Sequence, residues 1–265
     1  MFPKANKTLG QHFLKDKNVI EAITSDFAQE AEVIIEVGPG PGVLTEKLAK
    51  IGKPFYAFEL DKRFKEILKG HVEDGKLFFT DALHFEWNDF LEEKRLLDKK
   101  IWMVSNLPYQ ISSQLFVLFL QIEPIKYFTL MFQKEVAEKI IPPKDKKNTS
   151  GSLAILGQNY FDIKVLKKVP PGCFAPPPKV DSLVISGVRK KQSHFELSQF
   201  SQLENFLRHL YSQKRKQIGN LLRQKYPDYL KVLEKMQIPA TSRAEALDHK
   251  QVLGLCDMLE VKNGD

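Results

Sequence analysis

Short, continuous apolar runs alternate with amphipathic segments between residues 33 and 135, and this alternation limits the possible folds more than any other feature of the chain. Strands are expected at Val33–Val37, Phe55–Leu60, Leu77–Thr80, Ile101–Ser105 and Tyr127–Phe132. Helices are expected between them, at Leu44–Lys50, Arg63–Lys69 and Ser112–Gln121. Strands that are apolar throughout, each followed by a helix, are typical of a parallel sheet buried on both faces. The pattern therefore predicts a doubly wound α/β domain.

The pattern changes after this region. Ile163–Val169 and Val180–Val188 have strand character and are joined by a proline-rich loop. Two consecutive strands without a crossover helix pair antiparallel. A parallel sheet that ends in such a pair fits the Rossmann-like methyltransferase fold better than a nicotinamide-binding fold. Strand signals stop near residue 190 and helical spacing continues, which predicts an α/β domain over 1–190 and a small, all-helical domain over 191–265.

Charge, cysteine count and hydropathy narrow the class of protein. The longest strongly apolar run, Leu115–Ile122, is too short to cross a bilayer, and the basic N-terminus lacks the apolar core of a signal peptide. Two cysteines, Cys173 and Cys256, are too few for a disulfide framework or a zinc knuckle. We expect a cytoplasmic monomer that needs no metal. The net charge of +7, from 40 basic and 33 acidic residues, fits a polyanionic partner.

A glycine-rich turn follows the first expected strand. Gly38, Gly40 and Gly42 form a GPGPG loop that opens the next helix. Such a strand-to-helix turn is the usual site for a nucleoside-bearing cofactor, and its spacing differs from the GxGxxG of dinucleotide enzymes. Taken alone, the loop is as often an ordinary tight turn. Glu59 ends the second strand, 17 residues beyond Gly42, where this class of fold places an acid that binds ribose hydroxyls.

Two further acids follow expected strands. Asp61 has the position of a helix cap. Asp81, followed by Ala82, ends the third strand, where a carboxylate can accept a hydrogen bond from an adenine amino group. As an isolated residue, Asp81 is more often part of a turn or a cap. The order of these acids along successive strands favours a nucleoside cofactor.

The fourth strand ends in Asn106, Leu107, Pro108 and Tyr109. The Asn106 side-chain carbonyl and the backbone carbonyl of residue 107 or 108 can each accept one N–H bond from an exocyclic amine such as that of adenine. Tyr109 can stack on the base, an interaction that contributes roughly 1–3 kcal/mol. Methyl transfer to such an amine needs alignment more than a strong base. In isolation the four residues would more often be a strand-terminating turn.

The chain resembles the ribosomal RNA adenine dimethyltransferases from about residue 7 to residue 260. The resemblance rests on the motifs GQHFL at 10–14, GPGPG at 38–42, NLPY at 106–109 and PPKVDS at 177–182, together with Glu59 and Asp81. The segments at 212–216 and 243–245 resemble the branch of the family that modifies the small subunit. The large-subunit branch resembles this part of the chain less well.

The resemblance implies S-adenosyl-L-methionine as the cofactor. It also implies transfer of two methyl groups to each of two adjacent adenines near the 3′ end of small-subunit rRNA, a step of ribosome biogenesis. His12, Leu14, Gly38, Glu59, Asp81 and Asn106 would contact the cofactor, and the N-terminal arm would fold over the site. His12 stands where many relatives have Asn.

A basic stretch follows in the C-terminal part. Residues 205–226 contain six basic residues and no acidic one: Arg208, Lys214, Arg215, Lys216, Arg223 and Lys225. With an adenine-directed motif upstream, this stretch is the expected contact with RNA phosphates of the small ribosomal subunit. A second basic cluster comprises Lys139, Lys144, Lys146 and Lys147. The alternatives that remain open are a large-subunit rRNA adenine methyltransferase and an assembly factor that acts mainly by binding.

Overall fold

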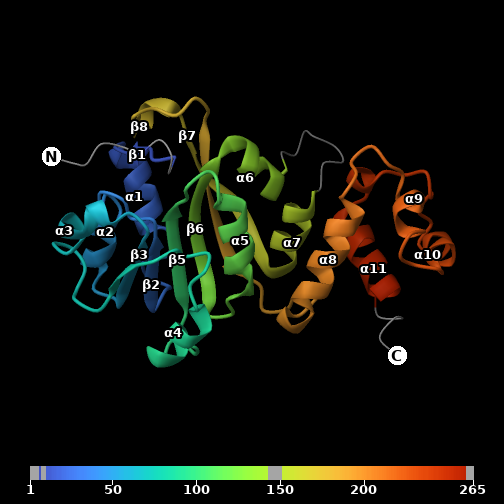
Figure 1. Cartoon of the computed structure of the whole chain (residues 1–265), viewed down its shortest axis with the longest axis horizontal. Coiled ribbons are helices and arrows are strands. Elements are labelled where there is room, and N and C mark those ends of the chain that lie inside the picture. The colour runs from blue at the N-terminus through green and yellow to red at the C-terminus, as the bar shows by residue number, and fades with distance from the viewer. Residues whose placement is uncertain (1–5, 7–9, 143–150, 261–265) are drawn as a thin grey trace. The chain divides into compact units, whose positions relative to one another are not determined.

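The computed structural model of the chain describes residue 6 and residues 10–142 and 151–260. Its main sheet has seven strands in the order β4-β3-β2-β5-β6-β9-β7 (Figure 1). Their bounds are β2 Val33–Val37, β3 Phe55–Glu59, β4 Leu77–Phe79, β5 Ile101–Asn106, β6 Ile125–Gln133, β7 Phe161–Val169 and β9 Ser182–Arg189. Strands β2 to β6 run parallel, and β9 pairs antiparallel with both β6 and β7. The expected doubly wound sheet with a terminal antiparallel pair is confirmed.

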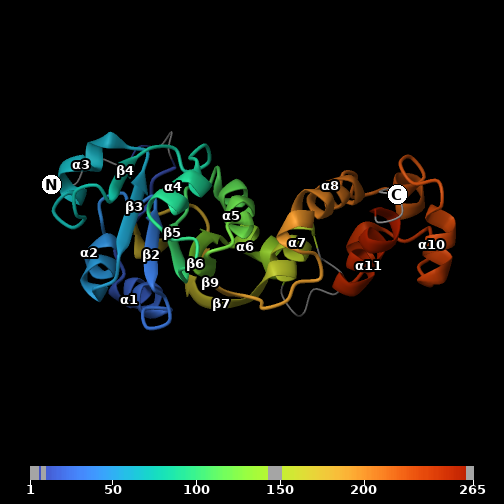
Figure 2. The same cartoon turned by 90° about the horizontal axis from the view of Figure 1, so that it is seen from below.

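Helices cover both faces of this sheet. The helices of this part of the chain are α1 Lys17–Ser25, α2 Thr45–Leu48, α3 Lys65–Leu68, α4 Trp87–Glu93, α5 Ser112–Gln121 and α6 Lys134–Ile140. Helices α1 and α2 lie on one face, and α4 and α5 lie on the other (Figure 2). Because each face is covered, every residue of β2 and β3 is buried, which explains why these strands are apolar runs without alternation.

Each face has its own apolar core. On the α1 face, Val19, Ile23 and Leu48 pack with sheet residues such as Ile34 and Trp102. On the α4 face, aromatic rings pack against Phe58: the ring centroids of Phe78, Phe85, Trp87 and Phe90 lie 4.7 to 5.3 Å from its own. The two cores hold the sheet as a rigid platform, so the loops at its carboxyl edge start from fixed positions.

A two-stranded sheet lies beside the main one. Strand β1, Phe13–Leu14, pairs antiparallel with β8, Phe174–Ala175. The backbone N–H of Lys15 also donates to the Cys173 carbonyl at 2.8 Å. This pairing joins the N-terminal arm to the loop between β7 and β9, about 160 residues away along the chain, and the apolar pattern does not predict it.

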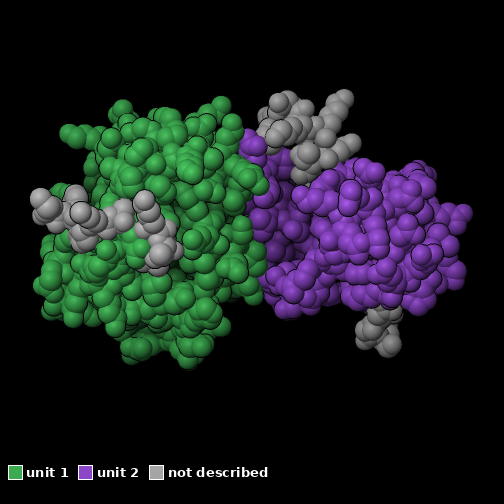
Figure 3. Space-filling view, turned by 45° about the horizontal axis from the view of Figure 1, so that its top comes forward, with its two compact units in different colours: residues 1–137, 161–189 green, residues 138–160, 190–265 purple. Residues whose placement is uncertain are grey.

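The chain divides into two compact units, coloured separately in Figure 3. The sheet unit comprises residues 1–137 and 161–189, and the helical unit comprises residues 138–160 and 190–265. The helical unit contains α7 Ser152–Tyr160, α8 Phe200–Leu210, α9 Ile218–Leu222, α10 Tyr229–Lys235 and α11 His249–Glu260. None of the described helices is long and apolar enough to span a membrane.

Residues 138–160 differ from the sequence expectation, which assigned them to a domain over 1–190. Helix α7 contacts α8 and α11. The Asn159 side chain donates to the Phe195 carbonyl at 2.9 Å and accepts from the Phe195 N–H at 3.2 Å, and Tyr160 stacks on Phe200. The apolar face of α7 is therefore buried by helices that follow it in sequence, which local patterns do not reveal.

Candidate active site

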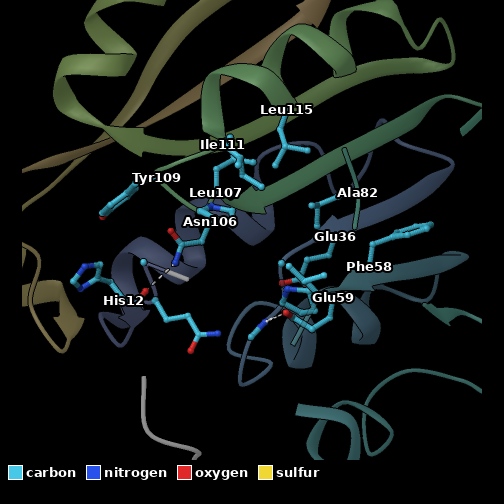
Figure 4. Close-up of a pocket in the computed structure, with 18 of the residues that line it drawn as sticks. His12, Glu36, Phe58, Glu59, Ala82, Asn106, Leu107, Tyr109, Ile111 and Leu115 are labelled. Atoms are coloured by element: carbon cyan, nitrogen blue, oxygen red, sulfur yellow. Dashed lines mark hydrogen bonds between the residues drawn. The ribbon is translucent and has the colours of Figure 1, made fainter. Parts of the chain in front are cut away.

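A cavity of about 310 Å³ opens at the carboxyl ends of β2, β3 and β5. It brings together the residues that the sequence singled out from five separate segments. All four expected catalytic residues line it, Asn106, Leu107, Pro108 and Tyr109, as do seven other expected cofactor residues, His12, Leu14, Gly38, Gly40, Glu59, Asp81 and Ala82. Its size suits a small-molecule ligand. His12 and Tyr109 lie on one side of it, Glu36 and Glu59 lie on the other, and Asn106 lies between them (Figure 4).

The three loop glycines have different roles. All three have positive φ, which favours glycine: 70° at Gly38, 56° at Gly40 and 83° at Gly42. A Cβ on Gly38 would lie 3.9 Å from Pro108, and one on Gly40 would lie 3.8 Å from Phe13, so both backbones pass close to the cavity wall. The structure does not place Gly42 at the cavity. Its N–H donates to the Pro39 carbonyl at 3.0 Å, so it shapes the turn.

Glu59 is fixed by backbone donors. It ends β3, is 6% exposed, and accepts from the N–H of Gly40 and of Asp61, each at 2.8 Å. Burial raises the pKa of this carboxyl above its ordinary value. A carboxylate offers about four lone-pair positions, so acceptor capacity remains for a ligand hydroxyl.

Asp61 caps the following turn through the Arg63 N–H, as expected, and the Arg63 side chain lowers the pKa of Asp61 to about 2.

Asp81 lines the cavity and also stabilises a turn. One carboxylate oxygen accepts from the Leu83 N–H at 2.9 Å, and the other lies 3.1 Å from Nδ1 of His84. Asp81 therefore lies at the cavity, where the cofactor interpretation needs it, and it also forms the turn that the alternative interpretation predicts. Ala82 is buried beside it, and its carbonyl accepts from the indole N–H of Trp87 at 2.9 Å.

Two cavity residues were missed by the sequence interpretation. Leu60 is 54% exposed and lines the cavity directly after Glu59, so a large apolar side chain is open to a ligand. Glu36 is 1% exposed and accepts from the hydroxyl of Thr45 at 2.7 Å. Burial raises the pKa of Glu36 to about 8. The available signal for Glu36 was its charge in an otherwise apolar strand, because a buried carboxyl without a cationic partner is costly.

The Asn106 amide has a defined orientation. Its Nδ2 donates to the backbone carbonyl of His12 at 3.2 Å. Because a carbonyl only accepts, the nitrogen must face His12, and the oxygen faces the side where Tyr109 lies (Figure 4). The Pro108 carbonyl already accepts from the Ile111 N–H at 3.2 Å. Within the part of the chain that the structure describes, the Leu107 carbonyl has no donor, so it is the freer of the two expected backbone acceptors.

Tyr109 is held at both ends. Its hydroxyl is 3.0 Å from the hydroxyl of Ser182, and the His12 ring stacks on its ring with centroids 5.6 Å apart and planes at 27°. Nδ1 of His12 lies 2.8 Å from the Pro176 carbonyl, so this nitrogen carries the proton and donates. Burial raises the pKa of Tyr109. The β1–β8 pairing places His12 and Pro176 side by side.

The five expected RNA-binding residues lie in the helical unit and are exposed: Arg208, Lys214, Arg215, Lys216 and Arg223. Arg208 belongs to α8 and pairs with Glu204 at 3.1 Å. The next three lie between α8 and α9, and Arg223 follows α9. Of the second basic cluster, Lys139 lies in α6, whereas Lys144, Lys146 and Lys147 lie outside the described residues.

Over the described ranges, no group of three metal-ligating side chains comes together.

Comparisons with known proteins agree with this geometry. A family model described as ribosomal RNA adenine dimethylase matches residues 2–261. The chain is 35% identical over 256 residues to ribosomal RNA small subunit methyltransferase A of Mycoplasmopsis synoviae, covering 94% of this chain and 95% of that one. It is 33% identical over 264 residues to the protein of the same name from Sulfurihydrogenibium, covering 97% of each.

Solved structures show the same likeness. A dimethyladenosine transferase from Plasmodium falciparum matches with a TM-score of 0.74 and 26% identity, covering 95% of this chain and 98% of that one. The 23S rRNA methyltransferase ErmE shares the fold, with a TM-score of 0.66 at 24% identity, covering 94% and 99% of the two chains. From the family match over almost the whole length, the chain belongs to the ribosomal RNA adenine dimethylase family.

Proposed function

We propose that this protein transfers methyl groups from S-adenosyl-L-methionine to the exocyclic amino groups of two adjacent adenines near the 3′ end of small-subunit rRNA, giving N6,N6-dimethyladenine. The observation that carries the proposal is the orientation of Asn106 at the cavity, where its amide nitrogen donates to the His12 carbonyl and its amide oxygen is left as an acceptor for a ligand. Family membership and the names of the relatives support the substrate.

The cavity fits this cofactor. Glu59 has acceptor capacity for ribose hydroxyls, and Leu60 offers an apolar surface to a flat base. Gly38 and Gly40 allow the ligand to approach the backbone. Glu36 and Glu59 lie on the same side of the cavity, so polar groups of the cofactor would have hydrogen-bond partners there (Figure 4).

The protein's part in the reaction is to position the target amine. The Asn106 oxygen and the Leu107 carbonyl each accept one N–H, which fixes the nitrogen and turns its lone pair toward the cofactor side. Tyr109 stacks on the adenine, a contact that contributes roughly 1–3 kcal/mol. When bound, S-adenosylmethionine supplies a methyl group on a sulfonium, which leaves a neutral thioether. The methylated amine then releases its proton to water. Alignment of the amine with the methyl group would account for a large share of the rate enhancement, as in other reactions that join two reactants.

The helical unit is the proposed docking part. Arg208, Lys214, Arg215, Lys216 and Arg223 are exposed within a short stretch of chain and suit contacts with phosphates. Such contacts position an RNA without reading its sequence. The protein acts in this proposal as a cytoplasmic monomer without a metal.

Asn106→Ala tests the proposal directly. Removing one of two acceptors for the amine should lower methyl transfer into under-methylated small subunits by about 10- to 100-fold. Binding of the subunits should change little, and binding of the cofactor, measured by calorimetry, reports separately on the cofactor contact that the resemblance implies for Asn106. Gln121→Ala, an exposed change at the end of α5, is the matched control and should leave all three unchanged. Undiminished methyl transfer by Asn106→Ala would refute the role of this side chain, and loss of subunit binding would contradict separate docking and chemistry.

A further inference from the structure

We propose that the edge strand β7 of the sheet unit binds the phosphates of the substrate strand next to the target base, through Lys167 and Lys168 and, more weakly, Lys164. The inference rests on the proposed function, because the base held at Asn106 defines where the strand passes. It concerns the sheet unit only, and it adds a second RNA surface to the basic residues of the helical unit.

Strand register places these lysines at the level of the active site. Asn106 pairs with Met131 on β6, Met131 pairs with Val184 on β9, and Val184 pairs with Lys167 on β7. Lys167 therefore lies in the same cross-sheet row as Asn106, three strand spacings away, which is roughly 14 Å. A second contact connects β9 with the active site, because the hydroxyl of Ser182 on β9 lies against the hydroxyl of Tyr109.

The direction of β7 brings its basic end to the correct edge. It is antiparallel to β9, which is antiparallel to β6, so β7 ends at the same edge as the parallel strands. Its one acidic residue, Asp162, lies near its beginning, whereas Lys167 and Lys168 lie next to its last residue. Positive charge is thus concentrated where an RNA strand would leave the cavity.

Both terminal lysines of β7 are exposed, and a bulge lies just before them. The pairing with β9 shifts register between Val165 and Lys167, and Leu166 packs against the apolar core. Lys164, Lys167 and Lys168 are all exposed. Across residues 10–142 and 151–260, no ion pair involves any of the three, so the structure shows no intramolecular role for their charges.

Protection of the sheet edge is the competing explanation. Lysines and bulges on an edge strand prevent pairing with another chain. A charge of either sign serves that purpose, whereas only a positive charge attracts phosphates. Reversal of the charges therefore separates the two roles.

The experiment compares four double variants of the full chain. In Lys167→Glu/Lys168→Glu the edge stays charged but repels phosphates, and in Lys167→Arg/Lys168→Arg the positive charge is kept. The control is Lys99→Glu/Lys100→Glu, an adjacent pair just before the central strand β5, at the end of that strand away from the cavity. Binding of each to under-methylated small subunits is measured at several salt concentrations, and cofactor binding is measured by calorimetry.

The charge-reversed β7 variant should bind the subunits at least tenfold more weakly, with unchanged cofactor affinity and without self-association. The arginine variant and the control should match the unmodified protein. In Lys167→Gln/Lys168→Gln, the slope of log K against log salt should fall by about 1.4. Unchanged binding and slope in the β7 variants would overturn the inference, and self-association with normal binding would assign the lysines to edge protection. If the unmodified protein binds subunits but transfers no methyl group, the proposed function fails independently of this result.

Discussion

His12 connects the N-terminal arm to the residues that meet the substrate. Its carbonyl orients the Asn106 amide, its ring stacks on Tyr109, and its Nδ1 donates to the Pro176 carbonyl. The resemblance implied a cofactor contact for this residue, and the structure places its ring on the Tyr109 side of the cavity, opposite Glu59 (Figure 4). Its ring can therefore act on the substrate side by holding Tyr109 in the orientation for stacking.

His12→Ala should raise the KM for under-methylated subunits about tenfold, a change of about 1.4 kcal/mol, with a small effect on the KM for the cofactor. The backbone carbonyl that holds Asn106 is kept in this variant, so kcat should fall less than in Asn106→Ala. His12→Phe keeps the ring and should restore most of the substrate affinity. Equal changes in both KM values would contradict a role limited to Tyr109.

Glu36 makes stability depend on pH. Its pKa is about 8 in the folded chain, against 4.5 for the free side chain. The unfolded chain therefore binds fewer protons between these values, and the free energy of unfolding falls as pH rises from about 4.5 through about 8. Glu36→Gln keeps an acceptor for Thr45 and lacks this titration.

Urea unfolding of Glu36→Gln at pH 6 and pH 9 measures the effect. Between pH 6 and pH 9, the free energy of unfolding of the variant should rise relative to that of the unmodified protein by an amount on the order of 2 kcal/mol. The reason is that one proton contributes about 1.4 kcal/mol per pH unit. The exposed Glu66→Gln is the control. Identical pH dependence in all three proteins would show that Glu36 is ionised in the folded chain at neutral pH.

At the scale of elements, the pairing of β6 with β9 depends on one glycine. Gly187 pairs directly with Phe128, and a Cβ at this position would lie 2.3 Å from the Phe128 ring. The ring is packed between Phe116 and Phe161, with centroids 5.9 and 5.0 Å away, so it has little space to move. Strand β9 thus carries a glycine because an aromatic side chain of its neighbour occupies the space.

Gly187→Ala should destabilise the protein by about 1–3 kcal/mol, the usual cost of overpacking a core. Chemical denaturation measures the change. Gly172→Ala is the matched control, because a Cβ there meets nothing within 4 Å and its φ is not positive. A variant at position 187 as stable as the control would show that the Phe128 ring relaxes freely.

The sequence predicted those helices and strands whose burial is recorded in the residue pattern of the segment itself. Strand β2 and helix α5 have the expected bounds, because continuous apolar runs and helical spacing record burial directly. Strand β6 is longer than expected at both ends, and α2 and α3 are only four residues each, with a 3-10 turn after α2 and another before α3. The β1–β8 pair was not predicted, since two residues far from their partners leave no periodic signal.

The same distinction holds for the site. Glu59, Asp81 and Asn106 could be identified because each ends or closely follows a strand, and parallel strands bring their carboxyl ends together. Leu60 and Glu36 were missed because their roles depend on exposure and burial in three dimensions. Two further features depend on contacts between residues far apart in the sequence. The orientation of the His12 side chain depends on its contact with Pro176, and the position of Gly42 outside the cavity lining depends on packing near Leu68.

At the scale of the whole molecule, the cavity and the residues proposed to bind RNA are distributed over two compact units. The sheet unit holds the cavity and the β7 lysines in fixed register with Asn106, and the helical unit holds the exposed basic stretch that includes Lys214, Arg215 and Lys216. An adenine inside a duplex must be extruded before its amine can reach such a cavity. In the proposed account, phosphate contacts on both units would hold the strand while one base occupies the site.

The most direct test is methyl incorporation from radiolabelled S-adenosylmethionine into under-methylated small subunits, large subunits and naked DNA, with mass mapping of the product. The account predicts N6,N6-dimethyladenine at two adjacent positions, confined to the 3′ region of the small-subunit RNA. Label confined to large-subunit RNA would contradict the proposed substrate. Absence of label from all three, with the cofactor bound, would contradict the proposed activity and favour a protein that acts by binding the subunit.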